Sequence, residues 1–215
     1  MKGYHSLENC GKYLIRAKMT PKEKDVVLAA KETLMDTVRK NYDGGCVVDV
    51  GCGPFTSLNH FTDLDFETFI GIDVSKPMIS LAYEMAEEKN VKFTGHIADL
   101  NTEPVPVESR SADLVINCGT LPCLHSIDNI FAESARVVKK DGYIVLSAFA
   151  VQNIIAGPAV TLHVPTCGMM YCYTITEILR QANNANCMPV HISTPKPVQF
   201  NGFTFAHSLF ILKPR

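Results

Sequence analysis

Two closely spaced glycines stand beside an acid in the stretch VVDVGCGP, residues 47–54. Asp49 lies in an apolar run, and Gly51 and Gly53 follow it directly. A structural turn needs one glycine at most, whereas two glycines allow a sharp bend and let backbone N–H groups approach a ligand closely. We therefore interpret this stretch as a ligand-binding turn.

Two further acids end the next two apolar runs of the chain. Asp73 stands where an acid after such a turn commonly binds the two hydroxyls of a ribose, and Asp99 ends the run that follows. Each acid alone is more simply a helix cap or a turn residue. Three acids at three successive strand ends, next to a glycine turn, instead indicate one shared ligand.

The glycine turn departs from the fingerprint of dinucleotide-binding proteins. The pattern G-x-G-x-x-G requires a glycine where this chain has Thr56, and Pro54 stands at its fourth position. Three nearby carboxylates without a compensating arginine would also repel a pyrophosphate. A cationic ligand that carries an adenosine suits the site better, so an NAD-dependent oxidoreductase is the less favoured enzyme class.

Apolar runs typical of buried strands carry these acids and continue after them. They cover residues 46–50, 67–73, 91–99, 112–117 and 142–149, and two more follow at 188–193 and 203–212. No helical pattern separates the last two runs. We therefore expect a hairpin between them, with the final strand antiparallel to its neighbours.

Helical patterns separate most of these strands. Helices are predicted after Thr20, after Ser75, over residues 127–138 and after Thr174. We expect the sequence KKDG, residues 139–142, to end the third of them, with Gly142 as a left-handed cap. Strands that alternate with helices predict an α/β fold, a doubly wound and mostly parallel seven-stranded sheet with helices on both faces.

The composition of the chain bears on its expected partners and on its expected location in the cell. The net charge is −2 and no basic stripe is present, so we expect no nucleic-acid partner. No apolar run is long enough to span a membrane, and the first residues lack the core of a signal peptide, so we expect no membrane partner. The eight cysteines include no Cys-x-x-Cys pair. We interpret them as reduced thiols of a cytoplasmic protein and expect no bound metal.

Four successive stretches resemble the motifs of class I S-adenosylmethionine-dependent methyltransferases, which have a Rossmann-like fold. They are VVDVGCGP, GIDVSKPMISLA, HIADL and SADLVINCGTLPCL, the last followed by ARVVKKDGYIVLS. The likeness covers roughly residues 44–150, in the order and spacing of the family. It implies S-adenosylmethionine as cofactor, S-adenosylhomocysteine as product, and a single methyltransferase domain over residues 1–215 with its cofactor-binding core at 44–150.

The resemblance also implies a role for each matching residue. Asp49 would face the methionine amine, Asp73 would bind the ribose hydroxyls, and Asp99 would accept from the adenine amino group. Asn117 would place its backbone near the reacting methyl group. Phe55 stands where the family usually has a third glycine, and its ring is expected to reshape or cover the pocket. Tyr13, in the N-terminal segment outside the likeness, is a candidate to close over the cofactor. The other residues predicted to bind the cofactor are Gly51, Cys52, Gly53, Val74, Met78, Leu100 and Cys118.

The acceptor side is expected in a stretch without charge. From residue 142 to residue 176 the chain has no Asp, Glu, Lys or Arg. So long an apolar stretch is typical of a substrate pocket, a lid or a dimer contact. We predict a substrate-side or lid segment at 150–176, with Met170 and Tyr171 binding the acceptor. Tyr4, in an N-terminal cap segment at 1–20, is a third candidate.

Two histidines are candidate general bases. His125 follows the fourth strand and His163 lies in the uncharged stretch, although a lone histidine is more often structural. Two alternatives stay open: a non-catalytic cofactor-binding scaffold, and an arsenite-type methyltransferase that uses the thiolates of Cys118 and Cys167. The favoured hypothesis is methyl transfer to a small, largely uncharged molecule by a monomer or homodimer.

Overall fold

A computed structural model describes residues 40, 42, 44–55, 57, 66–152, 159–164, 168–194, 197–200 and 203–215. The strands of its main sheet are β1 (Gly45–Val50), β2 (Phe66–Asp73), β3 (Phe93–Ile97), β4 (Ala112–Cys118), β5 (Val138–Val151), β8 (Cys187–Ser193), β9 (Val198–Phe200) and β10 (Phe203–Pro214). Seven of them form one path in the order β3-β2-β1-β4-β5-β10-β8, and β9 pairs with β10.

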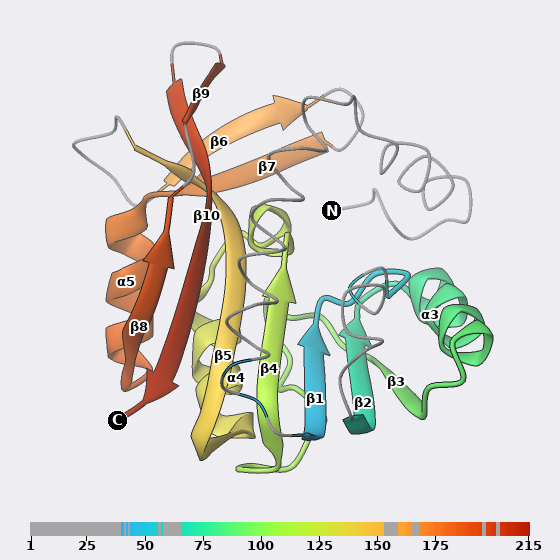
Figure 1. The fold of residues 1–215 in the computed structure, drawn as a ribbon. Coiled ribbons are helices and arrows are strands. Elements are labelled where there is room, and N and C mark those ends of the chain that lie inside the picture. The colour runs from blue at the N-terminus through green and yellow to red at the C-terminus, as the bar shows by residue number, and fades with distance from the viewer. Residues whose placement is uncertain are drawn as a thin grey trace.

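The strand directions confirm the predicted sheet. The five strands from β3 to β5 are parallel neighbours, whereas β10 is antiparallel to both β5 and β8. The carboxyl ends of β1, β2 and β4 therefore meet at one edge of the sheet, at the top in Figure 1. We call this edge, with the turns that leave it, the carboxyl edge.

Helices cover both faces of the sheet, as predicted. They are α3 (Lys76–Glu88), α4 (Asp128–Val137) and α5 (Ile175–Asn184), with a short 3₁₀ turn, η2 (Leu121–Cys123). Val48 packs in the core cluster that contains residues of α4 and α5, and Val47 packs in the cluster that contains residues of α3. β1 is therefore buried on both sides, which explains its continuous apolar run. None of the described helices is long and apolar enough to cross a membrane.

Two of the predicted helix caps are present. The Ser75 hydroxyl accepts the backbone N–H of Met78 at 3.4 Å, and the Thr174 hydroxyl accepts that of Glu177 at 3.1 Å. The helix predicted after Thr20 lies outside the described residues.

The predicted end of the third helix is wrong. α4 ends at Val137 and β5 begins at once, so residues 139–142 belong to the strand. They form an irregularity opposite Asp113, whose carboxylate binds the Lys139 ammonium at 2.7 Å. A Cβ on Gly142 would lie 2.7 Å from the Asp113 carbonyl oxygen. This glycine therefore permits a close approach of two backbones and is not a helix cap.

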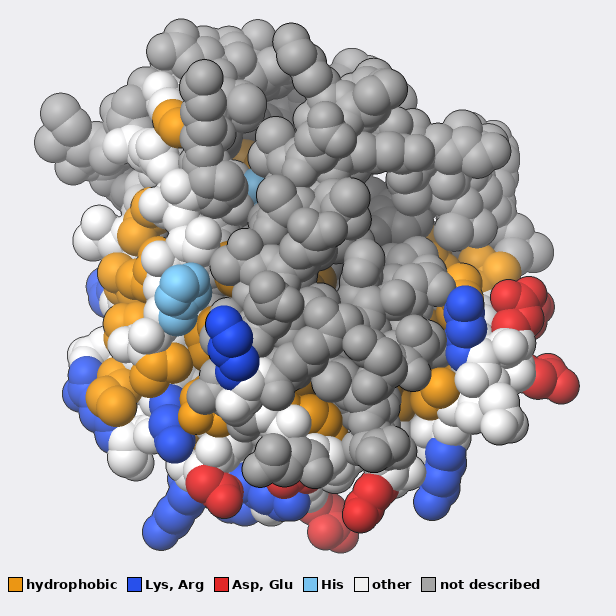
Figure 2. All heavy atoms as spheres, in the orientation of Figure 1, with side chains coloured by type: hydrophobic (Ala, Val, Ile, Leu, Met, Phe, Trp, Pro, Cys, Tyr) orange, Lys and Arg blue, Asp and Glu red, His pale blue; other side chains and the backbone are white. Residues whose placement is uncertain are grey.

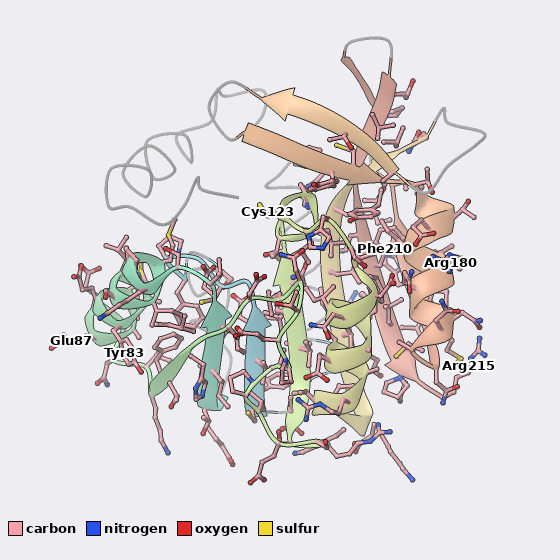
Figure 3. The ribbon with its side chains drawn as sticks, turned by 180° about the vertical axis from the view of Figure 1, so that it is seen from behind. Tyr83, Glu87, Cys123, Arg180, Phe210 and Arg215 are labelled. Atoms are coloured by element: carbon pink, nitrogen blue, oxygen red, sulfur yellow. The ribbon has the colours of Figure 1, made fainter. Side chains whose placement is uncertain are left out.

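A second, two-stranded sheet occupies much of the uncharged stretch. β6 (Ala159–Val164) and β7 (Gly168–Tyr173) pair antiparallel as a hairpin that the sequence analysis did not predict. The hairpin crosses beyond the carboxyl ends of β4 and β5, as Figures 1 and 3 agree. The Tyr173 hydroxyl donates to the Leu124 carbonyl oxygen at 2.8 Å, which fixes β7 to the chain after β4.

Candidate active site

The glycine turn after β1 is attached to the end of β2. The backbone N–H groups of Gly51 and Cys52 both donate to the Ile72 carbonyl oxygen, at 2.7 and 3.0 Å. The N–H of Gly53 donates to Oδ2 of Asp73 at 2.9 Å. The turn and the second acid are therefore neighbours, as the motif spacing predicted.

Three glycines at the carboxyl edge have positive φ angles, but they serve different purposes. Gly51, with φ of 81°, has no space for a side chain, because a Cβ would lie 2.1 Å from the Thr120 hydroxyl oxygen. For Gly53 and Gly119, with φ of 53° and 82°, no atom of the described residues lies within 4 Å of a Cβ position. Gly51 thus permits internal packing, whereas the other two have open space beside them among the described residues.

The Phe55 ring does not cover this site. Its backbone keeps a positive φ of 63°, the conformation that glycine adopts most easily, yet its side chain is fully buried. The ring packs against Phe69 and Phe93, with centroids 4.3 and 4.8 Å apart, in the core cluster on the α3 side. The expectation that the ring covers the pocket is therefore wrong, because the ring adds to the core. The expectation that it reshapes the pocket stays a prediction.

Asp49 is a buried acid without a cation beside it in the described part of the chain. Burial raises its pKa to about 7; the Ser57 hydroxyl, which donates to Oδ2 at 2.5 Å, acts against this rise, and the nearby charge of Asp73 adds to it. Such a site favours a cationic ligand, which would stabilise the ionised carboxylate.

Asn117 at the end of β4 presents an unused acceptor. Its side-chain amide donates to the Val50 carbonyl oxygen at 2.6 Å, but its Oδ1 is buried and has no hydrogen-bond partner in the described part of the chain. An unpaired buried acceptor costs about 1–3 kcal/mol. A ligand with N–H groups near β1 and β4 would supply the missing donor.

Asp99 and its surroundings form the third part of the edge. Oδ1 of Asp99 accepts two hydrogen bonds from Asn101, and these bonds hold the pKa of Asp99 below its usual value. Val74, which follows Asp73, is 40% exposed and offers an apolar surface there. Met78 and Leu100, both predicted to contact the cofactor, are buried.

The residues predicted on the acceptor side differ in burial, and some of their side chains lie outside the described residues. Met170 and Tyr171 are half-buried neighbours on β7, and Tyr171 packs against the core cluster that contains η2 residues. His125 is exposed, with its backbone N–H bound to the Asn101 side chain. His163 lies in β6, but its side chain is outside the described residues. Tyr4 and Tyr13 also lie outside them.

The thiols do not gather in the described part of the chain. Cys118 is half-buried at the end of β4, Cys52 is buried in the glycine turn, and Cys167 lies outside the described residues. Among the described residues, no three His, Cys, Asp or Glu side chains are close enough to hold a metal ion. The arsenite-type alternative gains no support from them.

Residues 48–146 match the family described as methyltransferase domain. This stretch contains all three acids and the glycine turn. This stretch is similar to a methyltransferase domain. The family match ends four residues before the predicted end of the cofactor core and leaves the β6–β7 hairpin outside.

Individual relatives of the methyltransferase domain agree with this assignment. The chain is 30% identical over 106 residues to a malonyl-[acyl-carrier protein] O-methyltransferase of Marinomonas sp. (strain MWYL1), covering 48% of this chain but only 38% of the relative's length. The fold of this chain is similar to that of an S-adenosylmethionine-dependent methyltransferase of Clostridium acetobutylicum. The TM-score is 0.68 at 12% identity, over 97% of this chain and 99% of that one.

A further structure of similar fold contains bound ligands. The fold is similar to geranyl diphosphate C-methyltransferase of Streptomyces coelicolor A3(2) in complex with Mg²⁺, geranyl diphosphate and S-adenosylhomocysteine. The TM-score is 0.66 at 13% identity, over 92% of this chain and 87% of that one. At such low identity this likeness concerns the fold.

Four residues of the site escaped the sequence analysis. Ser57 donates to Asp49, Thr120 donates to the Gly51 carbonyl oxygen at 3.1 Å, Gly119 borders open space, and Asn101 binds Asp99. A glycine directly after a buried strand was a signal for Gly119. The other three carry no pattern of their own, because their partners are far away in the sequence or are backbone groups.

Proposed function

We propose that this chain transfers the methyl group of S-adenosylmethionine to a small, largely uncharged acceptor. One observation carries the proposal. The carboxyl edge joins a buried carboxylate, Asp49, to a second carboxylate, Asp73, around glycines that border open space, while an uncharged hairpin crosses the same end of the sheet.

The residues present fit the cofactor. Asp73 would bind the ribose hydroxyls, and Asp99 the adenine amino group through its Oδ2. Asp49 and the unpaired Oδ1 of Asn117 would accept from the methionine ammonium, with Gly53 leaving room for the chain of the ligand. The bound cofactor supplies a methyl group on a sulfonium, whose leaving thioether is neutral.

The chain's own contribution is chiefly alignment and exclusion of water. With a neutral leaving group, the protein has little charge to stabilise on that side, so rate depends on holding the acceptor in line with the methyl group. The hairpin is well placed for this role, because the Tyr173–Leu124 hydrogen bond fixes it beside the chain that follows β4. A general base, His125 or His163, is needed only if the acceptor must lose a proton.

The uncharged hairpin favours a neutral or apolar acceptor. Figure 2 shows no charged side chain among the described residues around β6 and β7 on the face it presents, and residues 142–176 contain none. The similar Streptomyces enzyme binds geranyl diphosphate, and the Marinomonas relative acts on a malonyl-[acyl-carrier protein]. This stretch offers no lysine or arginine for a diphosphate, so we expect a less charged molecule here.

A labelled-methyl screen tests the proposal. The full chain is incubated with methyl-labelled S-adenosylmethionine and a panel of small acceptors, neutral apolar ones beside their phosphorylated counterparts. We expect labelled product from neutral acceptors and little from the phosphorylated ones. Cofactor binding without transfer to any acceptor would instead support the non-catalytic scaffold.

A further inference from the structure

Asn101 is at the centre of a hydrogen-bond network at the adenine end of the carboxyl edge. Its backbone N–H and its side-chain Nδ2 both donate to Oδ1 of Asp99, at 3.0 and 2.9 Å. Its Oδ1 accepts the backbone N–H of His125 at 3.1 Å. One side chain thus contacts the acid after β3 and the chain after η2.

These bonds fix the direction of the Asp99 carboxylate. Both bonds that the carboxylate accepts in the described part of the chain end on Oδ1, so Oδ2 stays available for a ligand. The backbone N–H of Asp99 donates to the Glu103 carboxylate at 2.5 Å, which fixes the main chain at the same residue. The bonds from Asn101 lower the pKa of Asp99, in keeping with an ionised carboxylate that accepts hydrogen bonds.

The segment that Asn101 contacts through His125 is fixed at both ends. Thr120 donates to the Gly51 carbonyl oxygen in the glycine turn, and the Leu124 carbonyl oxygen accepts from Tyr173 of β7. Figure 3 shows Cys123, in η2, lying just below the hairpin. Asn101 therefore connects the adenine end to a segment that also borders the methionine end and the acceptor side.

We propose that Asn101 is a positioning residue that gives this site its selectivity for adenine. By holding Oδ1, it directs Oδ2 of Asp99 toward the 6-amino group of the cofactor and against a 6-carbonyl group. The inference rests on the proposed function, since it requires the cofactor to bind at this edge. It adds a residue that the motif resemblance does not include.

The test compares two ligands that differ at this group. S-adenosylhomocysteine and S-inosylhomocysteine, which has a carbonyl in place of the 6-amino group, are titrated calorimetrically into the full chain. The ratio of the two Kd values is the selectivity. A hydrogen bond to a charged group predicts a wild-type ratio of about tenfold or more in favour of S-adenosylhomocysteine.

Three variants separate orientation of Asp99 from support of the loops. Asn101→Ala removes the side-chain bonds to Asp99 and His125 and keeps the backbone N–H that donates to Asp99. Asn101→Asp keeps an acceptor for the His125 N–H but removes the side-chain donor to Asp99. Asn129→Ala is the matched control, because Asn129 supports the same loop through the carbonyl oxygens of Leu100 and Glu103 without contacting Asp99.

We expect both Asn101 variants to lose about three- to tenfold of the selectivity, and Asn129→Ala to keep the wild-type ratio. Unchanged selectivity in the Asn101 variants would overturn the proposal. The proposal would also be overturned if Asn101→Asp kept the wild-type selectivity, or if Asn129→Ala lost as much selectivity as the Asn101 variants. Either result would assign the effect to general support of the loops. If the wild-type chain binds neither ligand, the proposed function itself fails; if it binds S-adenosylhomocysteine and only the ratios disagree, this inference alone fails.

Discussion

The cofactor side and the acceptor side of the carboxyl edge are built in opposite ways. On the cofactor side, the buried or partly buried polar groups Asp49, Asp73 and Asn117 make hydrogen bonds to residues of β1 and of the turn that follows it. On the acceptor side, the hairpin is uncharged, and the Tyr173 hydroxyl donates to the segment after β4. The difference indicates that fixed charges select the cofactor, whereas shape and exclusion of water select the acceptor.

The largest effect is expected from the loss of a general base. If such a base exists, the acceptor side contains a titratable group after all. Replacing His125 or His163 with Ala should lower kcat by about 10²–10⁴-fold for whichever residue is the base, and flatten the pH profile of kcat. The other variant serves as the control. A small loss of kcat in both variants would show that alignment alone governs methyl transfer. It would also strengthen the contrast between a charged cofactor side and an uncharged acceptor side.

Replacing Phe55 tests whether its ring belongs to the core or to the cofactor site. Phe55→Ala should reduce the free energy of unfolding by about 3–5 kcal/mol, because it removes a fully buried ring. The Kd for S-adenosylhomocysteine should stay near its wild-type value, since the ring packs against Phe69 and Phe93. Chemical denaturation and calorimetry check the two expectations. Weaker cofactor binding with unchanged stability would show that the Phe55 ring lines the cofactor pocket instead of the core.

Removing a carboxylate from the cofactor side should weaken binding clearly. Asp73→Ala should weaken S-adenosylmethionine binding by about 1–3 kcal/mol, because two ribose hydroxyls lose a charge-assisted partner. Asp99→Ala should cost less, since one amino donor is affected. Asp141→Ala, an exposed acid far from this edge, is the control for net charge. Unchanged affinity in both site variants would mean that the cofactor binds elsewhere.

The pKa of Asp49 predicts opposite pH trends for binding and for stability. Its folded value of about 7 lies above the ordinary 3.8, so the ligand-free chain should lose stability as pH rises from about 4 to about 7. A cationic ligand prefers the ionised carboxylate, so affinity for S-adenosylmethionine should rise with pH, by up to about tenfold per unit below pH 7. Asp49→Asn should flatten both curves in thermal unfolding and calorimetry. A pH-independent wild-type affinity would contradict the assignment.

A smaller effect is expected on the acceptor side. Met170→Ala should raise the acceptor KM by about three- to tenfold and leave cofactor affinity unchanged, because it removes binding shared by ground and transition states. Met188→Ala, on the exposed edge strand β8, is the matched control. If Met170→Ala instead converts a dimer to a monomer on a sizing column with turnover intact, the hairpin is an interface.

Local signals explain what the sequence predicted well. The caps at Ser75 and Thr174 depend on residues three positions apart, and β1 is a nearly continuous apolar run because it is buried on both faces. The three acids fall at strand ends, so the parallel topology brings them to one edge. These features need no knowledge of distant contacts.

Distant contacts explain what the sequence did not predict. The hairpin lies in a stretch with no charged residue, so polar and apolar positions do not alternate and strands are hard to recognise. Gly142 resembles a helix cap until Asp113 of the neighbouring strand is placed against it. The inward direction of Phe55 depends on Phe69 and Phe93.

Calorimetric titration of the full chain with S-adenosylmethionine, S-adenosylhomocysteine and NAD tests the central claim most directly. The claim is that the carboxyl edge, with Asp49, Asp73 and Asp99, is a site for a cationic adenosyl ligand. We predict saturable heats for the two adenosyl ligands, lost together in Asp73→Ala combined with Asp99→Ala, and no heat for NAD. Binding of NAD alone would contradict the account.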